Sequence, residues 1–204
     1  MIIYSRRGAL RLGSSTLGFG ALSALGACAT TPENAAESHQ NVGAETYTED
    51  EVVNAGADFL GTTAAAFGAA VEKVFKDNGR PNAYIKGEEG GGALVVGLRL
   101  GKGVLYTKSG LQEDVYWQGP SIGFDTGANA SKSFTLVYNL ETMDQIYRRY
   151  AGVEGSAYFI GGIGVNYQQN GRVVLAPMRA GVGFRLGANV GYLSYTRTRS
   201  AVPL

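Results

Sequence analysis

The sequence predicts an all-β fold: a small soluble antiparallel β-barrel of about ten strands, with a flanking N-terminal helix and one short inserted helix. From Tyr84 onward, segments of roughly five to nine residues alternate apolar and polar side chains, as strands with one buried face do. Most of the 31 glycines lie between residues 79 and 191, where they allow the tight coiling of a small sheet. A two-sheet sandwich is the alternative architecture.

The expected strands share this alternation and are separated by turn residues. They are Ala83–Lys86, Ala93–Leu100, Val104–Lys108, Val115–Gln118, Ser121–Thr126, Ser133–Tyr138, Ser156–Tyr167, Arg172–Ala176, Gly181–Leu186 and Val190–Arg197. The short helix is expected at Glu141–Tyr150, so the barrel domain spans residues 81–197 and a tail follows at residues 198–204. Most of these strands are shorter than the roughly 9–11 residues of a membrane-spanning barrel strand, which disfavours an outer-membrane barrel.

An N-terminal helix is expected over residues 47–80. It begins with Thr48-Glu49-Asp50-Glu51, a capping box in which the threonine and the last glutamate satisfy each other's backbone amides. Its apolar residues keep helical spacing up to Asn78-Gly79, where the helix ends. Interior glycines allow close packing or mark a break near Gly61. We expect this helix to cover an open end or edge of the sheet; a partner-binding or membrane-surface helix is the alternative.

The residues before Cys28, the only cysteine, have the layout of an export signal. A basic segment with Arg6 and Arg7 precedes an uncharged apolar stretch. Leu25-Gly26-Ala27-Cys28 then matches the site where a lipoprotein signal peptidase cleaves, so a signal peptide is expected at residues 1–27 and a lipid on Cys28. The paired arginines resemble a twin-arginine signal, which leaves export by the Tat or the Sec route open.

This signal predicts where the protein is found. We expect a periplasmic domain anchored to the outer membrane as a lipoprotein, because Ala29 rather than an aspartate follows Cys28. Residues 28–46 are small and polar and are expected to form a flexible tether. If Cys28 is not acylated, the signal is a plain periplasmic one and the protein is soluble in the periplasm. A transmembrane helix is disfavoured, because the uncharged stretch is shorter than the roughly 20 residues that span a bilayer.

Charge and composition exclude several classes of function. Removing the three signal arginines from 18 basic residues leaves 15 against 17 acidic ones, so no basic stripe for nucleic acid is expected. The only histidine, His39, lies in the tether, which excludes a Ser-His-Asp hydrolase, a cysteine protease and the common zinc sites from the domain. No cofactor or metal is expected. A carboxylate-pair glycosidase remains, with the candidates Glu88, Glu89, Glu113, Asp114, Asp125 and Glu154.

Three residues are candidates for ligand binding. Trp117, the only tryptophan, is expected in the core with its indole N–H on a carbonyl; an aromatic rim at a ligand mouth is the alternative. Arg99 and Arg185 occupy equivalent places in two similar segments and have apolar neighbours. A buried arginine needs an anionic partner, which predicts Asp125 or Glu154 as the partner, or an anionic lipid headgroup.

Several runs resemble the EipA family of periplasmic cell-envelope integrity proteins: Gly152–Tyr158, Tyr116–Asp125 and Arg185–Tyr192. The resemblance covers roughly Tyr47 to Arg197. It implies a small soluble β-barrel with an N-terminal helix that acts in envelope maintenance, and it brings no catalytic residues. The family is described as soluble, whereas this chain carries a lipoprotein signal. A weaker, pattern-level similarity links the glycine-rich strands around Trp117 to the SYLF lipid-binding domain.

Together these observations predict a non-enzymatic envelope protein that binds an envelope lipid, a glycan or an envelope protein. The alternatives are a carboxylate-dependent hydrolase of envelope glycans and a purely structural lipoprotein. A hydrolase needs two carboxylates facing one cleft, whereas a binding protein needs an apolar or arginine-lined pocket. A structural protein would have neither, with its barrel filled by side chains.

We predict that Cys28→Ser releases the protein from the membrane fraction into the soluble periplasmic fraction, because serine cannot form the thioether that carries the lipid. Cell fractionation, with mass spectrometry of the mature N-terminus, measures this. A wild-type protein that is already soluble and has an unmodified N-terminus would contradict the predicted anchor.

Overall fold

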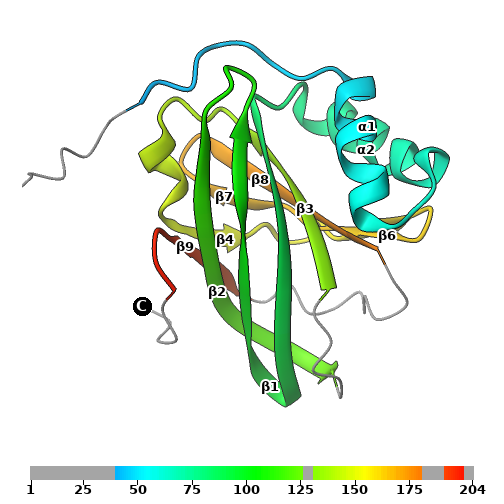
Figure 1. The fold of residues 1–204 in the computed structure, drawn as a ribbon. Helices are drawn as coiled ribbons and strands as arrows, with labels where there is room; N and C mark the ends of the chain where they lie inside the picture. Colours follow the sequence, from blue (N-terminus) through cyan, green and yellow to red (C-terminus); the bar gives the residue numbers. More distant parts are fainter. Residues whose placement is uncertain (1–39, 126–130, 181–190, 200–204) are drawn as a thin grey trace, which may run out of the picture. The chain divides into compact units, whose positions relative to one another are not determined.

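The computed structural model describes residues 40–125, 131–180 and 191–199 of the chain (Figure 1). Within these ranges the chain forms two α-helices, one 3-10 helix and nine β-strands, which confirms the β-dominated fold class. The expected signal with Arg6, Arg7 and Cys28 lies outside the described residues. So does the expected strand Gly181–Leu186, which contains Arg185.

The strands vary widely in length, and the longest come first. They are β1 (Ala83–Thr107), β2 (Gln112–Asp125), β3 (Ser131–Tyr138), β4 (Arg149–Gly152), β5 (Tyr158–Ile160), β6 (Ile163–Val165), β7 (Gln168–Asn170), β8 (Val173–Ala180) and β9 (Tyr192–Thr196). A strand as long as β1 is exceptional, since strands usually have about 3–10 residues. Its length is explained by a bend.

Strand β1 doubles back on itself, so that its two limbs lie side by side (Figure 1). Just beyond its ends, the Lys108 N–H donates to the carbonyl oxygen of Asn82 at 3.0 Å. Further along the limbs, Gly87 and Gly103 face each other so closely that a Cβ on Gly103 would lie 2.9 Å from the Gly87 Cα. The sequence predicts three separate strands over this region, and that prediction is wrong at their joints. The pairs Asn82–Lys108 and Gly87–Gly103 are both centred on residue 95, so the bend falls inside the expected strand Ala93–Leu100.

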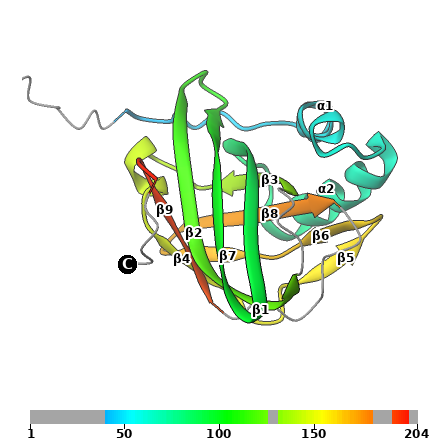
Figure 2. The same ribbon diagram turned by 60° about the horizontal axis from the view of Figure 1, so that its bottom comes forward.

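The sheet closes into an antiparallel barrel (Figure 2). Its strands follow the order β3-β1-β2-β9-β4-β7-β8, and β8 pairs again with β3 over Ser133–Tyr138. With the two limbs of β1 counted separately, the closed ring has eight strands. β6 and β5 extend from β8 as two extra strands outside this ring, which together matches the expectation of about ten strands.

The wall of the barrel has an apolar core on each side, because successive strand residues point to opposite faces. Inside, the lumen core is built from Val42, Ala83, Ile85, Leu105, Val115, Trp117, Val137, Leu140, Met143, Ile146, Tyr150, Val173, Leu175, Leu193 and Tyr195. Outside, alternate residues of the same strands, such as Phe134, Leu136 and Met178, pack against the helices. The same alternation that predicted strands therefore sorts their side chains between two cores.

Two helices, α1 (Glu49–Leu60) and α2 (Ala64–Asn78), take the place of the single expected helix. The capping box at Thr48 is present, and the break falls at Gly61, which has a left-handed backbone with φ 70°. α1 contacts β3, while α2 contacts β5 and β6. The helices thus cover an outer wall of the barrel and its extra strands. Because β5 is the last strand in the sheet order, this agrees with the expected place at an edge of the sheet and not with the alternative of an open end.

The short inserted helix expected at Glu141–Tyr150 is present but shorter than expected. The chain there forms a 3-10 helix, η1 (Met143–Ile146), followed directly by β4. Tyr150 pairs with Leu193 of β9, and its ring is fully buried in the lumen core. This long-range pairing outweighs the local helical pattern.

The end of the barrel next to η1 is covered by residues 40–47, which we call the strap. Asn41 bridges Thr142, and the Val42 N–H donates to the Glu141 carbonyl at 3.0 Å. Val42 is fully buried in the lumen core. At the other end of the strap, the Tyr47 N–H donates to the Pro81 carbonyl at 2.8 Å. Residues 40–46, expected as part of a flexible tether, are instead fixed to the barrel.

Among the described residues, no helix is both long and apolar enough to cross a membrane.

We predict that Gly56→Ala lowers the free energy of unfolding by about 1–3 kcal/mol through overpacking. A methyl group at this α1 position would overlap the ring of Phe67 and lie 3.2 Å from Phe134, and both rings are fully buried. Denaturant unfolding measures the change.

The matched control is Gly68→Ala in α2. There a methyl group would meet only the Val53 Cγ2, at an ordinary 3.8 Å, so the higher helix propensity of alanine should raise stability by up to about 1 kcal/mol. Equal effects of the two substitutions would show that α1 and the barrel wall are not in the close contact described.

Candidate functional site

The side chains that line the lumen are apolar at one end and polar at the other. Near the strap it is apolar, with Ala83, Leu105 and Val137 fully buried. Toward the bend of β1 it becomes polar, with the buried residues Glu89, Ser133, Thr135, Gln168 and Arg179. A polar lumen wall must be hydrogen-bonded to be stable, so its partners define the candidate site.

Glu89 lies on the first limb of β1 and points into the lumen, where its side chain is 5% exposed. Arg179 of β8 binds it at two points: Nε donates to Oε1, and Nη2 donates to Oε2 at 3.1 Å. The Trp117 indole Nε1 of β2 donates to the same Oε2 at 3.2 Å. Three strands are thus joined through one carboxylate.

Two further residues complete this group, which we call the Glu89 cluster (Glu89, Arg99, Arg179, Trp117 and Asn166). Arg179 Nη1 donates to the Asn166 Oδ1 at 3.0 Å. Arg99, on the second limb of β1, brings its Nε to 3.8 Å from the Glu89 Oε1. The Arg99 side chain is 25% exposed, whereas that of Arg179 is 7% exposed. The cluster therefore reaches solvent on the Arg99 side.

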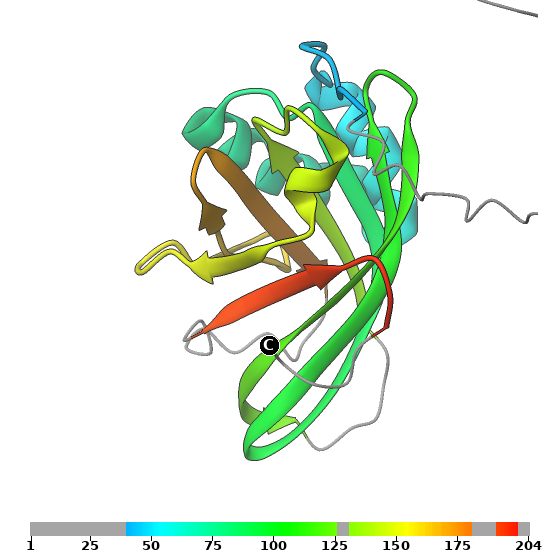
Figure 3. The ribbon, with the colours of Figure 1, turned by 90° about the vertical axis from the view of Figure 1, so that its left-hand side faces the viewer.

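Glycines make room for the indole in this cluster. A Cβ on Gly101 or Gly87 would overlap the Trp117 ring. On its other side the indole meets the Tyr195 ring of β9, with ring centroids 5.8 Å apart (Figure 3 shows β9 between β2 and β4). The indole is therefore held rigidly, with its N–H directed at Glu89.

The electrostatics keep Glu89 ionised. Burial alone would raise the pKa of this carboxyl, but the positive charges of Arg179 and Arg99 outweigh burial and hold the pKa below its ordinary value of 4.5. Hydrogen bonds from Arg179 and Trp117 act in the same direction. Burial also raises the pKa of the neighbouring Tyr195 hydroxyl, which stays protonated at neutral pH.

The structure brings together two of the three sequence candidates. Trp117 is 3% exposed, which confirms its expected place in the core, although its N–H meets a carboxylate where a carbonyl was expected. Arg99 pairs with Glu89, a partner that the sequence did not predict. Glu154 is exposed, and the side chain of Asp125 lies outside the described residues, as does Arg185.

Sequence analysis missed Arg179, the main partner of Glu89. The expected strand stopped at Ala176, directly before Pro177, but β8 continues to Ala180. Alternation from the inward-facing Leu175 would have placed Arg179 in the lumen. The sequence therefore contains the alternation that places Arg179 in the lumen, but the expected strand ended before it.

Glu88 and Glu89, two of the carboxylates that the sequence offered for catalysis, do not face one cleft. Glu88 and Glu89 are neighbours on one strand, and Glu88 is exposed while Glu89 is buried, as expected for opposite faces. Glu113 is occupied elsewhere, with an ion pair to Arg197 and a 2.9 Å hydrogen bond from the Tyr147 hydroxyl. Across the described ranges, no group of three or more His, Cys, Asp or Glu side chains could hold a metal ion.

Comparisons with known proteins point to one family. A family model described as EipA, envelope integrity protein A, matches residues 45–204. The crystal structure of a beta-barrel-like, uncharacterized protein from Brucella abortus is 48% identical, covers 78% of this chain and 99% of that chain, and has a TM-score of 0.72. No curated protein matches the chain.

We predict that Glu89→Gln destabilises the protein by about 3–5 kcal/mol at pH 7, because it leaves the buried Arg179 without a counter-charge. The lowered pKa of Glu89 means that its stabilising contribution is present above pH 4.5 and is lost as the pH falls through the folded-state pKa. The difference in stability between the wild type and the variant should therefore shrink on acidification.

Urea unfolding at pH 7 and in the acid range tests this. Glu88→Gln is the matched control: the same change on the exposed neighbour should alter stability little at either pH. If Glu89→Gln behaved like the control, the buried ion pair would not stabilise the fold.

Proposed function

The chain belongs to the EipA family, the envelope integrity proteins, and from this premise we propose that it is a non-enzymatic envelope protein that binds an anionic envelope molecule at the Arg99 side of the Glu89 cluster. The observation that carries the proposal is the pairing of two arginines with one lumenal carboxylate, at a point where Arg99 is partly exposed. The family gives the envelope role; the ligand and its site are our proposal.

The chemistry of the cluster supports an anionic ligand. A guanidinium group has five N–H donors in a planar fork, so it can serve a carboxylate on one side and an anionic oxygen on another. Glu89, Arg99 and Arg179 together carry one net positive charge. The buried Glu89 and Trp117 hold the arginines in place, which lowers the entropic cost of binding.

The state of Glu89 supports a non-enzymatic role. Among the described residues it is the only buried carboxylate. A general acid needs a raised pKa, whereas the pKa of Glu89 is lowered by its two arginines. This argues against the alternative of a carboxylate-dependent hydrolase of envelope glycans.

The ligand is an anionic group of the envelope, either a lipid headgroup or a phosphorylated or acidic glycan. The export signal supports a place for the protein in the periplasm, anchored through Cys28 at the outer membrane. A purely structural role is the second candidate. It is favoured by the apolar half of the lumen, which is filled by buried side chains such as Leu105, Tyr150 and Leu175.

Trp117 provides a direct test, since it is the only tryptophan and lies in the cluster. We predict a saturable change in its fluorescence with phosphatidylglycerol vesicles or with a phosphorylated disaccharide, and none with phosphatidylcholine vesicles. Arg99→Gln should weaken this binding about tenfold or more, because a hydrogen bond to a charged group contributes about 1.5–3 kcal/mol. Vesicles and disaccharide distinguish a lipid from a glycan ligand.

Arg148→Gln is the control, since this arginine is exposed and outside the cluster. A fluorescence response to neither anionic probe, or equal binding by the Arg99 and Arg148 variants, would contradict the proposed site and leave the structural role.

A further inference from the structure

A cavity of about 600 Å³ lies beside η1, within the usual size range of ligand pockets. One wall consists of residues of β1 and β2 that alternate with lumen-facing ones: Val104, Tyr106, Gln112 and Asp114. The rest of the lining comes from Glu113, Tyr147 and Arg197. The cavity therefore opens on the outside of the barrel, and none of the described residues that line it belongs to the Glu89 cluster.

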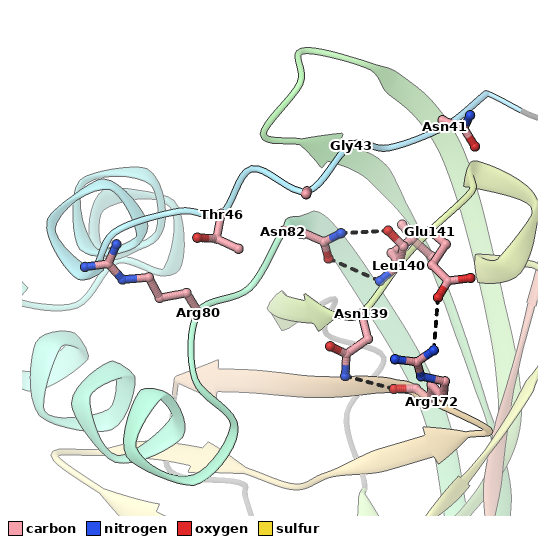
Figure 4. A pocket seen from close by; sticks show the side chains of 10 residues that line it. Asn41, Gly43, Thr46, Arg80, Asn82, Asn139, Leu140, Glu141 and Arg172 are labelled. Carbon is pink, nitrogen blue, oxygen red and sulfur yellow. Dashed lines mark hydrogen bonds and ion pairs between the residues drawn. The ribbon is translucent and has the colours of Figure 1, made fainter.

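The cavity beneath the strap offers less to a ligand (Figure 4). None of the described residues that line it is aromatic. The side chains of Asn82 and Asn139 are bonded within the protein, to the backbone of Leu140 and of Arg172 respectively. Figure 4 also shows the guanidinium group of Arg80 directed away from the cavity. The cavity beside η1 differs from it in both respects.

A stack of aromatic rings ends at the cavity beside η1. The Tyr106 ring stacks on Tyr84, with centroids 5.2 Å apart, and Tyr84 stacks on the fully buried Phe134 at 5.1 Å. Tyr84 lies on the first limb of β1, whereas the partner of Tyr106 on its other side is Gln112 of β2. The side of the Tyr106 ring away from Tyr84 therefore borders the cavity, next to Val104. The stack holds this apolar surface in place.

The polar part of the lining is ordered by its own contacts. The Arg197 guanidinium donates to Glu113 and to Asp144, and it lies 4.1 Å from the centroid of the Tyr147 ring. The Tyr147 hydroxyl donates to the Glu113 Oε2 at 2.9 Å. Burial, together with this carboxylate, raises the pKa of Tyr147, so its hydroxyl stays protonated. The two bonds of Arg197 leave further N–H groups of its guanidinium to donate.

Asp114 and Gln112 offer free hydrogen-bonding groups to the cavity. Both side chains are exposed, and neither makes a hydrogen bond with another described residue. A carboxylate only accepts hydrogen bonds, a guanidinium only donates them, and an amide does both. A sugar hydroxyl also does both, so a polyhydroxylated ligand can use all of these groups together.

From these observations we propose that the cavity beside η1 binds a neutral saccharide. One face of a pyranose ring packs against Tyr106 and Val104, because its C–H groups carry a slight positive charge and the face of an aromatic ring is negative. The hydroxyl groups of the sugar bond to Asp114, Gln112 and Arg197.

The charge of the lining favours a neutral ligand. One guanidinium, that of Arg197, stands against the two carboxylates of Glu113 and Asp114. The net negative charge disfavours an acidic glycan, and the guanidinium repels a small organic cation. This site thus differs in place and in ligand charge from the Glu89 cluster, and it does not depend on the function proposed there.

Saturation-transfer difference NMR of the purified mature protein tests the proposal with three neutral probes: maltotriose, mannotriose and tri-N-acetylchitotriose. We expect at least one to bind, with the strongest transfer to the protons on one face of a sugar ring. Trigalacturonate should not displace it at equal concentration, whatever it does at the Glu89 cluster.

Variants locate the bound sugar. Asp114→Asn should weaken binding about tenfold, because it removes a hydrogen bond to a charged group, and Asp58→Asn, the same change at an exposed position on α1, should not. Tyr106→Leu should lose the preferential transfer to one ring face, whereas Tyr116→Leu, on β2 outside the cavity, should keep it.

Three results would each overturn the proposal. They are binding of none of the three neutral probes, displacement of the bound sugar by trigalacturonate, and wild-type affinity of Asp114→Asn. The last of these is informative even if Tyr106→Leu fails to fold, because the exposed Asp114 side chain makes no hydrogen bond with another described residue.

Discussion

The ion pair between Glu89 and Arg179 joins residues 90 positions apart in the chain, and the register of the barrel depends on it. Glu88 and Glu89 are adjacent, so a slip of one residue in β1 would turn Glu89 outward and put Glu88 in the lumen. Only one register satisfies Arg179, Arg99 and Trp117 together. A buried ion pair is a modest source of net stability, but leaving one partner alone is costly, which disfavours the alternative registers.

The glycines of β1 serve this ion pair in two ways. Gly87 and Gly103 let the two limbs of β1 approach closely, which brings Arg99 of the second limb within reach of Glu89 on the first. Gly87 and Gly101 leave the space that the Trp117 indole fills. The composition that predicted a curved sheet thus also accounts for the packing of an indole against bare backbone. The glycines of β1 therefore shape both the barrel and the Glu89 cluster.

Sequence patterns predicted the features of this structure that depend on residues close together in the chain. The capping box at Thr48, the break at Gly61, the burial of Trp117 and the opposite faces of Glu88 and Glu89 follow from spacing alone. The errors concern contacts between distant segments. A helix was expected where Tyr150 pairs with β9, and Arg179 was missed because β8 runs through Pro177, which lacks the N–H group that a strand interior normally uses. Which carboxylate meets Arg99 depends on the bend of β1, and no local pattern encodes that pairing.

The strap has a mechanical consequence. Residues 40–47 cross the end of the barrel and hold Val42 in its interior, so tension on the chain upstream of Gln40 acts first on the hydrogen bonds to Glu141 and on this buried valine. The closed ring of strands would feel the force only after these contacts failed. Under such a force the protein would unfold in two stages. The strap would detach first, and the barrel would stay folded until the force acted on its strands.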